Sequence, residues 1–566
     1  MSLAAAAPAS GARRILARDE WVARGALVAV AAFLMLALGL PLWTMLSKSL
    51  QDGSGNFAGL VNFQRYFATP ALVHSLWNTL LIGAAVTLIT VPLAFVYAYA
   101  LTRSRMPMRS VFGAIAMLPL FAPSLLPAIA LIYIFGNQGF LKGFMGGAQI
   151  YGAAGIILAQ VLYCFPQALL ILTTALALSD ARLYDAADAM GTSRIRRFLT
   201  ITLPGAKYGA VSAGFVVFIL VITDFGIAKV IGGQFDMLAT DAYKQVVGQQ
   251  NFQMGAVVGL VLLAPAVLAF FADRVLQRRQ VALLSARSVA YEPKPDAARD
   301  RPLLVYCCVI SLIIIGVFAV AAWASFVTYW PYNLKLSLNN YNFEAFDPAG
   351  WQPYFNSLTM ALAVAAAGTA VTFSGAYLVE KTRGAEALRG FIHVLAMLPM
   401  AVPGLVLGLA YVFFFVAKWN PLNVFYGTLI LLTLNCIAHF YTVGHLTATT
   451  ALKQIDPEFE SVSASLKVPF YVTFFRVTLP VCMPAVMEIF IYFFVNALTT
   501  VSAVIFLYGP DTRLASVSIV HMDEAGQSAA AAGLATLILL TALVAKLLQL
   551  ALAHFAFARL QAWRKR

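Results

Sequence analysis

The sequence predicts an all-α integral membrane protein with twelve transmembrane helices, arranged as two tandem six-helix repeats. Of its 566 residues, 61% are hydrophobic and only 11% are charged, whereas soluble domains are about 45–50% apolar and about 25% charged. Stretches of about 20 apolar residues, the length that a helix needs to cross a bilayer, recur along the whole chain. Short motifs also recur in the two halves at a nearly constant spacing.

Twelve apolar stretches are the expected spans, six in each half. They are 25–47, 73–101, 111–136, 150–178, 206–231 and 253–273, then 303–329, 355–380, 390–417, 422–450, 482–507 and 528–557. The charged stretch 274–302, which contains Pro and Ala, predicts a cytoplasmic linker between them. We therefore expect a first repeat over 25–273, a second repeat over 303–557, and tails at 1–24 and 558–566.

The repeat is visible in the sequence itself. The matching segments, first half against second, are Thr-Arg 102–103 and 382–383, AMLPLFAP 116–123 and AMLPMAVP 396–403, ITLP 201–204 and VTLP 477–480, and His-Ser-Leu 74–76 and Asn-Ser-Leu 356–358. Their offsets lie between 276 and 282 residues. Because six spans return the chain to its starting side, the two repeats are expected to be parallel.

The distribution of positive charge predicts the orientation. With the N-terminus inside, the inner loops and tails hold 29 Lys and Arg, and the outer loops hold seven. Such an excess marks the cytoplasmic side, so both termini are expected in the cytoplasm. The net charge of +14 therefore orients the protein, and we expect no nucleic-acid partner.

Several kinds of chemistry have no counterpart in the sequence. No Gly-x4-Gly-Lys-Ser/Thr loop is present to cradle ATP, and no nucleophile and base form a plausible catalytic set. The five cysteines and six histidines lack the spacing of a metal site. We expect no catalytic residue, no metal and no cofactor, so the chain is not expected to be an enzyme.

The loop between the fourth and fifth spans, DAADAMGTSRIRRFLTITLP (185–204), carries a recognisable motif. It resembles the signature loop of binding-protein-dependent ABC importer permeases, which reads Glu-Ala-Ala, three residues, Gly, nine residues, Ile, one residue, Leu-Pro. Only the Glu differs, being Asp here. The matching residues are Asp185, Ala186, Ala187, Gly191, Ile201, Leu203 and Pro204.

The resemblance implies a permease built from type I importer repeats in a bacterial inner membrane. It implies two partner ATPase subunits that bind the ATP, and a periplasmic protein that delivers the solute. In the loop, the small Ala186 and Ala187 would press into a groove of the ATPase, and Gly191 would permit a turn. The alternative is an ordinary basic loop between two membrane helices.

The second half carries a degraded copy of this loop. The equivalent residues are Glu460, Ser461, Val462, Ser463, Lys467, Val477, Leu479 and Pro480. The Leu-Pro end is retained, but Lys467 replaces the Gly and the acidic residue has moved to Glu460 or Glu458. By resemblance this loop also docks an ATPase subunit, although the substitutions leave its geometry open.

A narrower resemblance concerns the solute. The segments TDFGIAKVIGG (223–233), ATDAYKQVVGQQNFQMGAVV (239–258) and SVSIVHMDEAGQSAAAAG (516–533) look like those of 2-aminoethylphosphonate permeases. The ferric-iron branch shares the Asp-Phe-Gly and is the alternative. A more distant alternative is a twelve-helix secondary transporter, whose Gly- and Asp-containing signature is missing from the loop TRSRMPMRS (102–110).

Two charges in the fifth span are candidate pathway residues, because a charge in hydrocarbon costs about 2.5–3.5 kcal/mol. Asp224 could face the ammonium group of a zwitterionic phosphonate, and Lys229 the phosphonate. Alternatively, Asp224 caps a broken helix and Lys229 reaches the outer interface. Thr500 stands at the position aligned with Asp224, so a charged contact would come from one half only.

Overall fold

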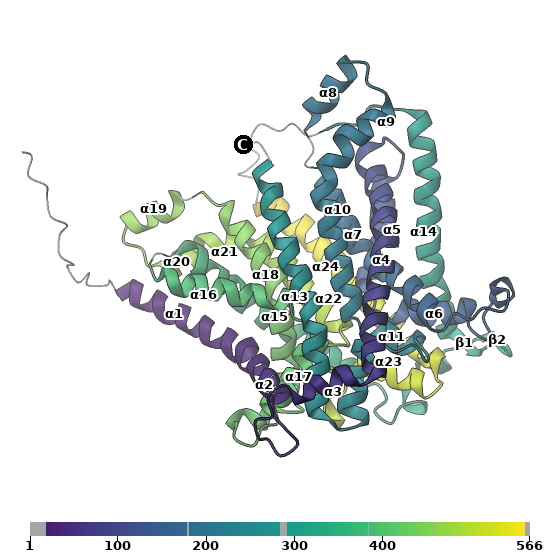
Figure 1. Ribbon diagram of the computed structural model, residues 1–566. Coiled ribbons are helices and arrows are strands. Elements are labelled where there is room, and N and C mark those ends of the chain that lie inside the picture. Colours follow the sequence, from purple (N-terminus) through teal and green to yellow (C-terminus); the bar gives the residue numbers. More distant parts are fainter. Residues whose placement is uncertain (1–17, 178–179, 284–290, 383, 457, 561–566) are drawn as a thin grey trace, which may run out of the picture.

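The computed structural model describes residues 18–177, 180–283, 291–382, 384–456 and 458–560 (Figure 1). Among them, nine helices are long and apolar enough to cross a membrane, and three bent helix pairs raise the number to twelve. The predicted all-α membrane fold is confirmed. The tails predicted at 1–24 and 558–566 and the linker predicted at 274–302 lie partly outside the described residues.

Among its described residues, the first half contains thirteen α-helices, several of them short. They are α1 (Arg18–Leu34), α2 (Leu40–Ser49), α3 (Val61–Ala68), α4 (Pro70–Arg103), α5 (Arg109–Ala116), α6 (Leu125–Phe135), α7 (Ala153–Ala177), α8 (Ala181–Ala189), α9 (Arg194–Arg197), α10 (Leu203–Thr223), α11 (Gly226–Ile231), α12 (Leu238–Tyr243) and α13 (Phe252–Leu283). A π-helical turn, Met35–Gly39, joins α1 to α2 as one span.

The second half repeats this order and adds a short antiparallel hairpin. Its elements are α14 (Ala297–Phe326), β1 (Val327–Tyr329), β2 (Asn333–Leu336), α15 (Gln352–Lys381), α16 (Glu386–Met397), α17 (Gly404–Phe415), α18 (Leu429–Lys453), α19 (Glu458–Ser465), α20 (Phe470–Thr473), α21 (Leu479–Val481), α22 (Met483–Thr499), α23 (Ala515–Glu524) and α24 (Ser528–Leu560).

The third span of each half is broken rather than kinked. Helices α5 and α6 meet at 101°, and α16 and α17 meet at 114°. The repeated Leu-Pro and following Pro lie in the breaks, at Pro119 and Pro123 and at Pro399 and Pro403. Proline has no amide hydrogen and cannot continue a helix without losing a hydrogen bond. The repeated Leu-Pro motif therefore marks a break in the third span of each half.

The fifth span of each half is also interrupted, as the alternative in which Asp224 caps a broken helix predicts for 206–231, whereas the sequence does not predict the break within 482–507. Helix α10 ends at Thr223 and α22 ends at Thr499. The next residues, Asp224 and Thr500, are extended, with ψ of 129° and 138°. In the first half a carboxylate supplies the reason. Asp224 Oδ2 accepts a hydrogen bond from the backbone N–H of Ile227 at 2.8 Å, which begins a new helix.

Matching hydroxyls hold the segment that follows each break. Thr79 Oγ1 in α4 accepts a hydrogen bond from Leu238 N at 2.9 Å. Ser357 Oγ in α15 accepts one from Ala515 N at 2.8 Å. These contacts align Asn-Thr-Leu 78–80 with Asn-Ser-Leu 356–358, an offset of 278 residues. The alignment of 74–76 with 356–358 at offset 282 is therefore wrong by one helical turn.

The first helix of each repeat packs on the other repeat. Helix α1 lies against α15 and α16, and α14 lies against α4, α5 and α6 (Figure 1). Tyr411 donates a hydrogen bond to the carbonyl of Ala37 at 2.8 Å, within the π-helical turn of the first span. Tyr306 of α14 donates to Leu93 O of α4, also at 2.8 Å. The two sequence repeats are therefore intertwined and do not form two separate bundles.

Candidate docking loops and translocation pathway

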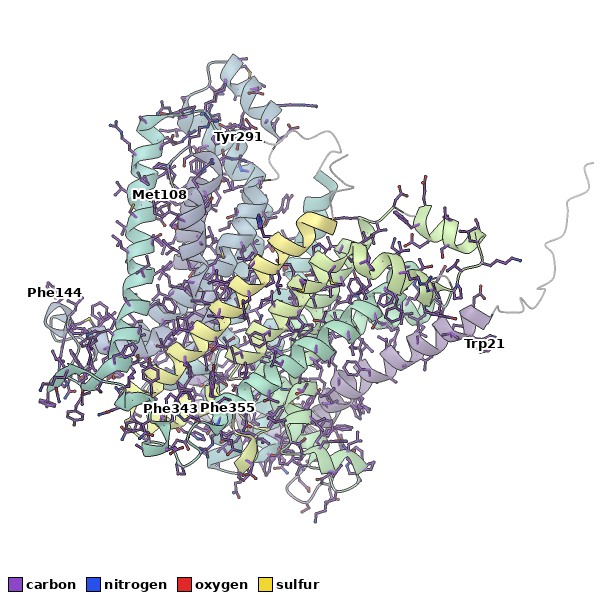
Figure 2. The ribbon with its side chains drawn as sticks, turned by 180° about the vertical axis from the view of Figure 1, so that it is seen from behind. Trp21, Met108, Phe144, Tyr291, Phe343 and Phe355 are labelled. Carbon is purple, nitrogen blue, oxygen red and sulfur yellow. The ribbon has the colours of Figure 1, made fainter. Side chains whose placement is uncertain are left out.

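The short helix α8 carries the first half of the predicted docking loop 1. The Asp180 side chain caps it by accepting a hydrogen bond from Arg182 N at 3.1 Å. Figures 1 and 2 show α8 at one end of the bundle, beyond the membrane helices and apart from α19. The position suits a contact with a separate protein.

The two faces of α8 differ sharply in exposure. Leu183 is 57% exposed and Met190, which follows the helix, is 77% exposed; Ala186 between them is also exposed. At 100° per residue these three side chains fall within about 60° of one another. An exposed apolar stripe of this kind indicates a protein contact, and we call these residues docking stripe 1.

Ala187 faces the other way. Its side chain is only 2% exposed and Tyr184 only 3%, so both lie on the face that packs on the permease itself. The expectation that both alanines of the motif enter a partner's groove is therefore wrong for Ala187, because the helical rotation that exposes Ala186 turns Ala187 inward. The other motif residues are accessible, with Asp185, Leu203 and Pro204 exposed and Ile201 partly buried.

Aromatic and polar contacts join loop 1 to the membrane helices. The Tyr184 hydroxyl lies 2.9 Å from Thr202 Oγ1. The Arg103 guanidinium, at the end of α4, lies 5.1 Å from the centre of the Tyr184 ring. Phe198 packs edge-on against Phe95, with ring centres 6.1 Å apart. These contacts tie α8 to the end of α4 and to the turn Phe198–Thr202 that precedes α10.

Loop 2 repeats this geometry despite its changed sequence. Gly191 has φ of +66° and Lys467 has φ of +54°, so both adopt the left-handed conformation that ends the helix. Thr192 N donates to Ala187 O at 3.0 Å, and Val468 N donates to Ser463 O at 2.9 Å. The geometry that the sequence left open is thus the same in both loops.

An equivalent apolar stripe is exposed on α19. Phe459, Val462 and Leu466 are 46%, 57% and 70% exposed, and they stand 276 residues after Leu183, Ala186 and Met190. We call them docking stripe 2. They line a groove of about 590 Å³ beside α19. Of the remaining motif residues, Ser461 and Pro480 are exposed, and Glu460, Ser463, Val477 and Leu479 are partly buried.

Loop 2 is joined to α15 by an ion pair, whereas loop 1 is joined to α4 by the contact of Arg103 with the Tyr184 ring. At the offset of 278 that aligns α4 with α15, Lys381 occupies the position of Arg103, so the predicted match of 102–103 with 382–383 is wrong by two residues, and residue 383 lies outside the described residues. Glu460 occupies the position of Tyr184, and Lys381 Nζ lies 2.9 Å from Glu460 Oε1. Phe474 packs on Tyr377, with ring centres 4.7 Å apart. The acidic residue of the motif therefore anchors α19 to α15 and does not face outward.

The conformation of Lys467 leads to a mutational prediction. A non-glycine residue in the left-handed region costs about 1–2 kcal/mol, so Lys467→Gly should be tolerated. Gly191→Lys should reduce stability by the same amount, about 1–2 kcal/mol. The loss of stability comes from the backbone conformation alone, because a Cβ at Gly191 would meet no atom within 4 Å and would cause no clash. Thermal unfolding and vesicle uptake of both variants check this. Loss of uptake in Lys467→Gly alone would contradict the equivalence of the two turns.

The structure gives Asp224 and Lys229 separate partners. Asp224 Oδ2 also accepts a hydrogen bond from Gln160 Nε2 at 3.0 Å, in addition to that from Ile227. Lys229 Nζ lies 2.5 Å from Glu524 Oε1, on α23 of the second half, and 5.3 Å from the centre of the Tyr243 ring. The alternative in which Asp224 caps a broken helix matches the geometry. Lys229 contacts the other half through Glu524, which lies between the predicted spans 482–507 and 528–557, in a stretch expected on the outer side.

Thr500 acts through its backbone. Its carbonyl accepts a hydrogen bond from Ser516 Oγ at 2.6 Å, which fixes the start of α23. Charge in this region does come from both halves, because Glu524 faces Lys229 across the repeats. The expectation that a charged contact with the solute comes from one half only stays a prediction, and Glu524 places a charge of the second half beside Lys229. Sequence comparison of 224 with 500 could not reveal Glu524, which lies on a different element.

Comparison with known proteins agrees with this arrangement. The model of the family "Binding-protein-dependent transport system inner membrane component" matches residues 90–281 and 373–555. The ferric transport system permease protein FbpB of Actinobacillus pleuropneumoniae is 27% identical over 81% of this chain and 68% of its own length. The putative ferric transport system permease protein FbpB 1 of Haemophilus influenzae is 28% identical over 78% of this chain and 71% of its own length.

A shorter relative matches part of the chain. The spermidine/putrescine transport system permease protein PotC homolog of Mycoplasma genitalium is 29% identical over 31% of this chain and 59% of its own length. These relatives are transport permeases rather than enzymes. With the family model matching both halves, the chain belongs to the binding-protein-dependent transport system inner membrane components, as a multi-pass ABC importer permease with two copies of the unit fused in one polypeptide.

Proposed function

We propose that this permease forms the pathway for a small zwitterion, 2-aminoethylphosphonate, with one ATPase subunit docked on α8 and another on α19. A periplasmic solute-binding protein delivers the solute to the opposite end of the bundle. Both termini are cytoplasmic, in agreement with the excess of positive charge in the loops that contain α8 and α19. The chain itself needs no cofactor, since the partner ATPases bind the ATP.

The Lys229–Glu524 pair is the observation that carries the choice of solute. Its two charges come from opposite halves of the permease, so any movement that separates the halves there also separates the charges. Separation leaves each charge without its counterion, at a modest cost because the side chains are 24% and 44% exposed. A zwitterion can relieve both costs at once, with its phosphonate at Lys229 and its ammonium group at Glu524. A solute that carries only positive or only negative charge would neutralise only one of these two side chains.

Ferric iron is the second candidate, because two relatives that match most of the chain are ferric transport permeases by name. Uptake measurements in cells that contain the chain, its ATPase and its binding protein distinguish 2-aminoethylphosphonate from ferric iron as the solute. We expect deletion of the permease to abolish accumulation of labelled 2-aminoethylphosphonate and growth on it as phosphorus source, with iron uptake unchanged. The reverse result would assign the permease to ferric iron.

A further inference from the structure

A small basic cavity lies between docking loop 1 and the segment that leads into the second repeat. Its volume is about 80 Å³. Its charged lining consists of four arginines and one carboxylate: Arg103, Arg194, Arg197, Arg299 and Asp296. Tyr291, from the segment between the repeats, also lines it, and Figure 2 shows this residue at the end of the bundle that carries α8.

Three of these arginines already have carboxylate partners. Arg194 pairs with Asp296 at 3.1 Å, Arg299 with Asp300 at 2.9 Å, and Arg197 with Asp188. Each of these side chains is therefore neutralised locally. The charge of Arg103 remains, because among the residues that the structure describes no carboxylate lies within 4.0 Å of its guanidinium nitrogens.

Arg103 is the most buried of the four, at 3% exposed. Its Nη2 donates to the carbonyl of Leu176 at 2.5 Å, and its guanidinium lies between the rings of Tyr184 and Tyr291, at 5.1 and 4.6 Å from their centres. Its Nε is buried without a hydrogen-bond partner. A buried donor without an acceptor costs about 1–3 kcal/mol, and more when the group is charged, so this arginine lacks an anion.

The second repeat shows what this position requires. Lys381 stands where Arg103 stands, and the carboxylate of Glu460 lies 2.9 Å from it. In the first repeat Tyr184 replaces that glutamate, so the built-in anion is missing. The same fold thus has a neutralised cation in one half and an unneutralised one in the other.

We propose that the cavity binds one small tetrahedral oxyanion, such as free inorganic phosphate, which joins docking loop 1 to the segment between the repeats. Guanidinium groups suit phosphate and sulfate because their fork of donors matches the oxyanion. The cavity volume of about 80 Å³ is several times the roughly 10–15 Å³ that one water needs, so an ion of this size is admitted. The site is separate from the Lys229–Glu524 pair and does not depend on the transported solute.

Calorimetric titration of the purified full-length chain in detergent with inorganic phosphate, at constant ionic strength in chloride, tests the site. We expect saturable binding of one phosphate per chain and a higher melting temperature. Tyr184→Glu, which copies the second repeat, should abolish binding while the chain remains folded. Arg103→Gln should also abolish it. Arg476→Gln, which removes an exposed charge from loop 2, and Lys229→Gln should both bind as the unmodified chain does.

Absence of saturable binding, or unchanged binding by Tyr184→Glu, would overturn the proposal. Loss of binding in Lys229→Gln would place the phosphate in the pathway instead and would also overturn it. A lipid headgroup offers the same chemistry, so the titration is repeated in nanodiscs of phosphatidylcholine and of phosphatidylglycerol. Equal binding in both supports a free anion. Binding lost only in phosphatidylglycerol would show that a lipid occupies the site.

Discussion

Ala186→Trp should abolish most ATP-dependent uptake while leaving membrane insertion and melting temperature unchanged. Ala186 lies in docking stripe 1, where its methyl group is exposed beside Leu183 and Met190. A large ring there would hold the ATPase away from α8. Overpacking costs about 1–3 kcal/mol, which is roughly a tenfold to hundredfold loss of affinity. Vesicle uptake and co-purification of the ATPase measure the effect.

Two variants of the same helix serve as controls. Ala187→Trp should lower the melting temperature of the permease itself, because Ala187 is 2% exposed and the ring would overpack its own chain. Ala189→Trp places the ring about 90° around the helix from the middle of the stripe and should reduce ATPase recovery least. Full uptake and ATPase recovery in Ala186→Trp would show that the exposed face of α8 is not the contact.

Reversal of the charge at Lys229 should produce the second large effect. Lys229→Glu places two carboxylates together, so the contact between α11 and α23 becomes repulsive. We expect uptake to fall by about tenfold or more, which corresponds to at least ~1.4 kcal/mol. Glu524→Lys should do the same. The exchanged double variant should recover a substantial part of the uptake, because an attractive pair between the halves is restored.

Lys244→Gln provides the comparison, because Lys244 pairs with Asp236 within the first half and does not join the repeats. It should leave uptake close to that of the unmodified chain. Single variants at 229 and 524 that transport normally, or an exchanged variant that is no better than either one, would contradict the role of the pair between the halves.

Composition and motif spacing were sufficient to predict the fold class and the family. Both follow from properties that are local in sequence, such as the length of an apolar stretch or the distance from Gly191 to the Leu-Pro. The helix breaks were only partly predictable. The carboxylate of Asp224 pointed to the break after α10, where it accepts a hydrogen bond from Ile227, whereas the matching break after α22 carries Thr500, which gave no such signal.

The docking faces show a different limit. The motif includes both Ala186 and Ala187, and their similar size suggested a similar role. The structure separates them by 100° of rotation, and so only one is exposed. The spacing of Leu183, Ala186 and Met190, repeated on α19, was the signal that could have identified the stripe. Glu524 could not be found in this way, because its partner Lys229 lies almost 300 residues earlier.

The central claim is that one chain docks two ATPase subunits through α8 and α19. Single cysteines at Met190 and Leu466, the most exposed residues of the two stripes at 77% and 70%, test it with a short thiol cross-linker on the assembled transporter. We predict that each cysteine cross-links to an ATPase subunit, and that the double-cysteine chain captures two. Capture of one ATPase subunit by only one loop, or of a second permease chain by either loop, would contradict the account.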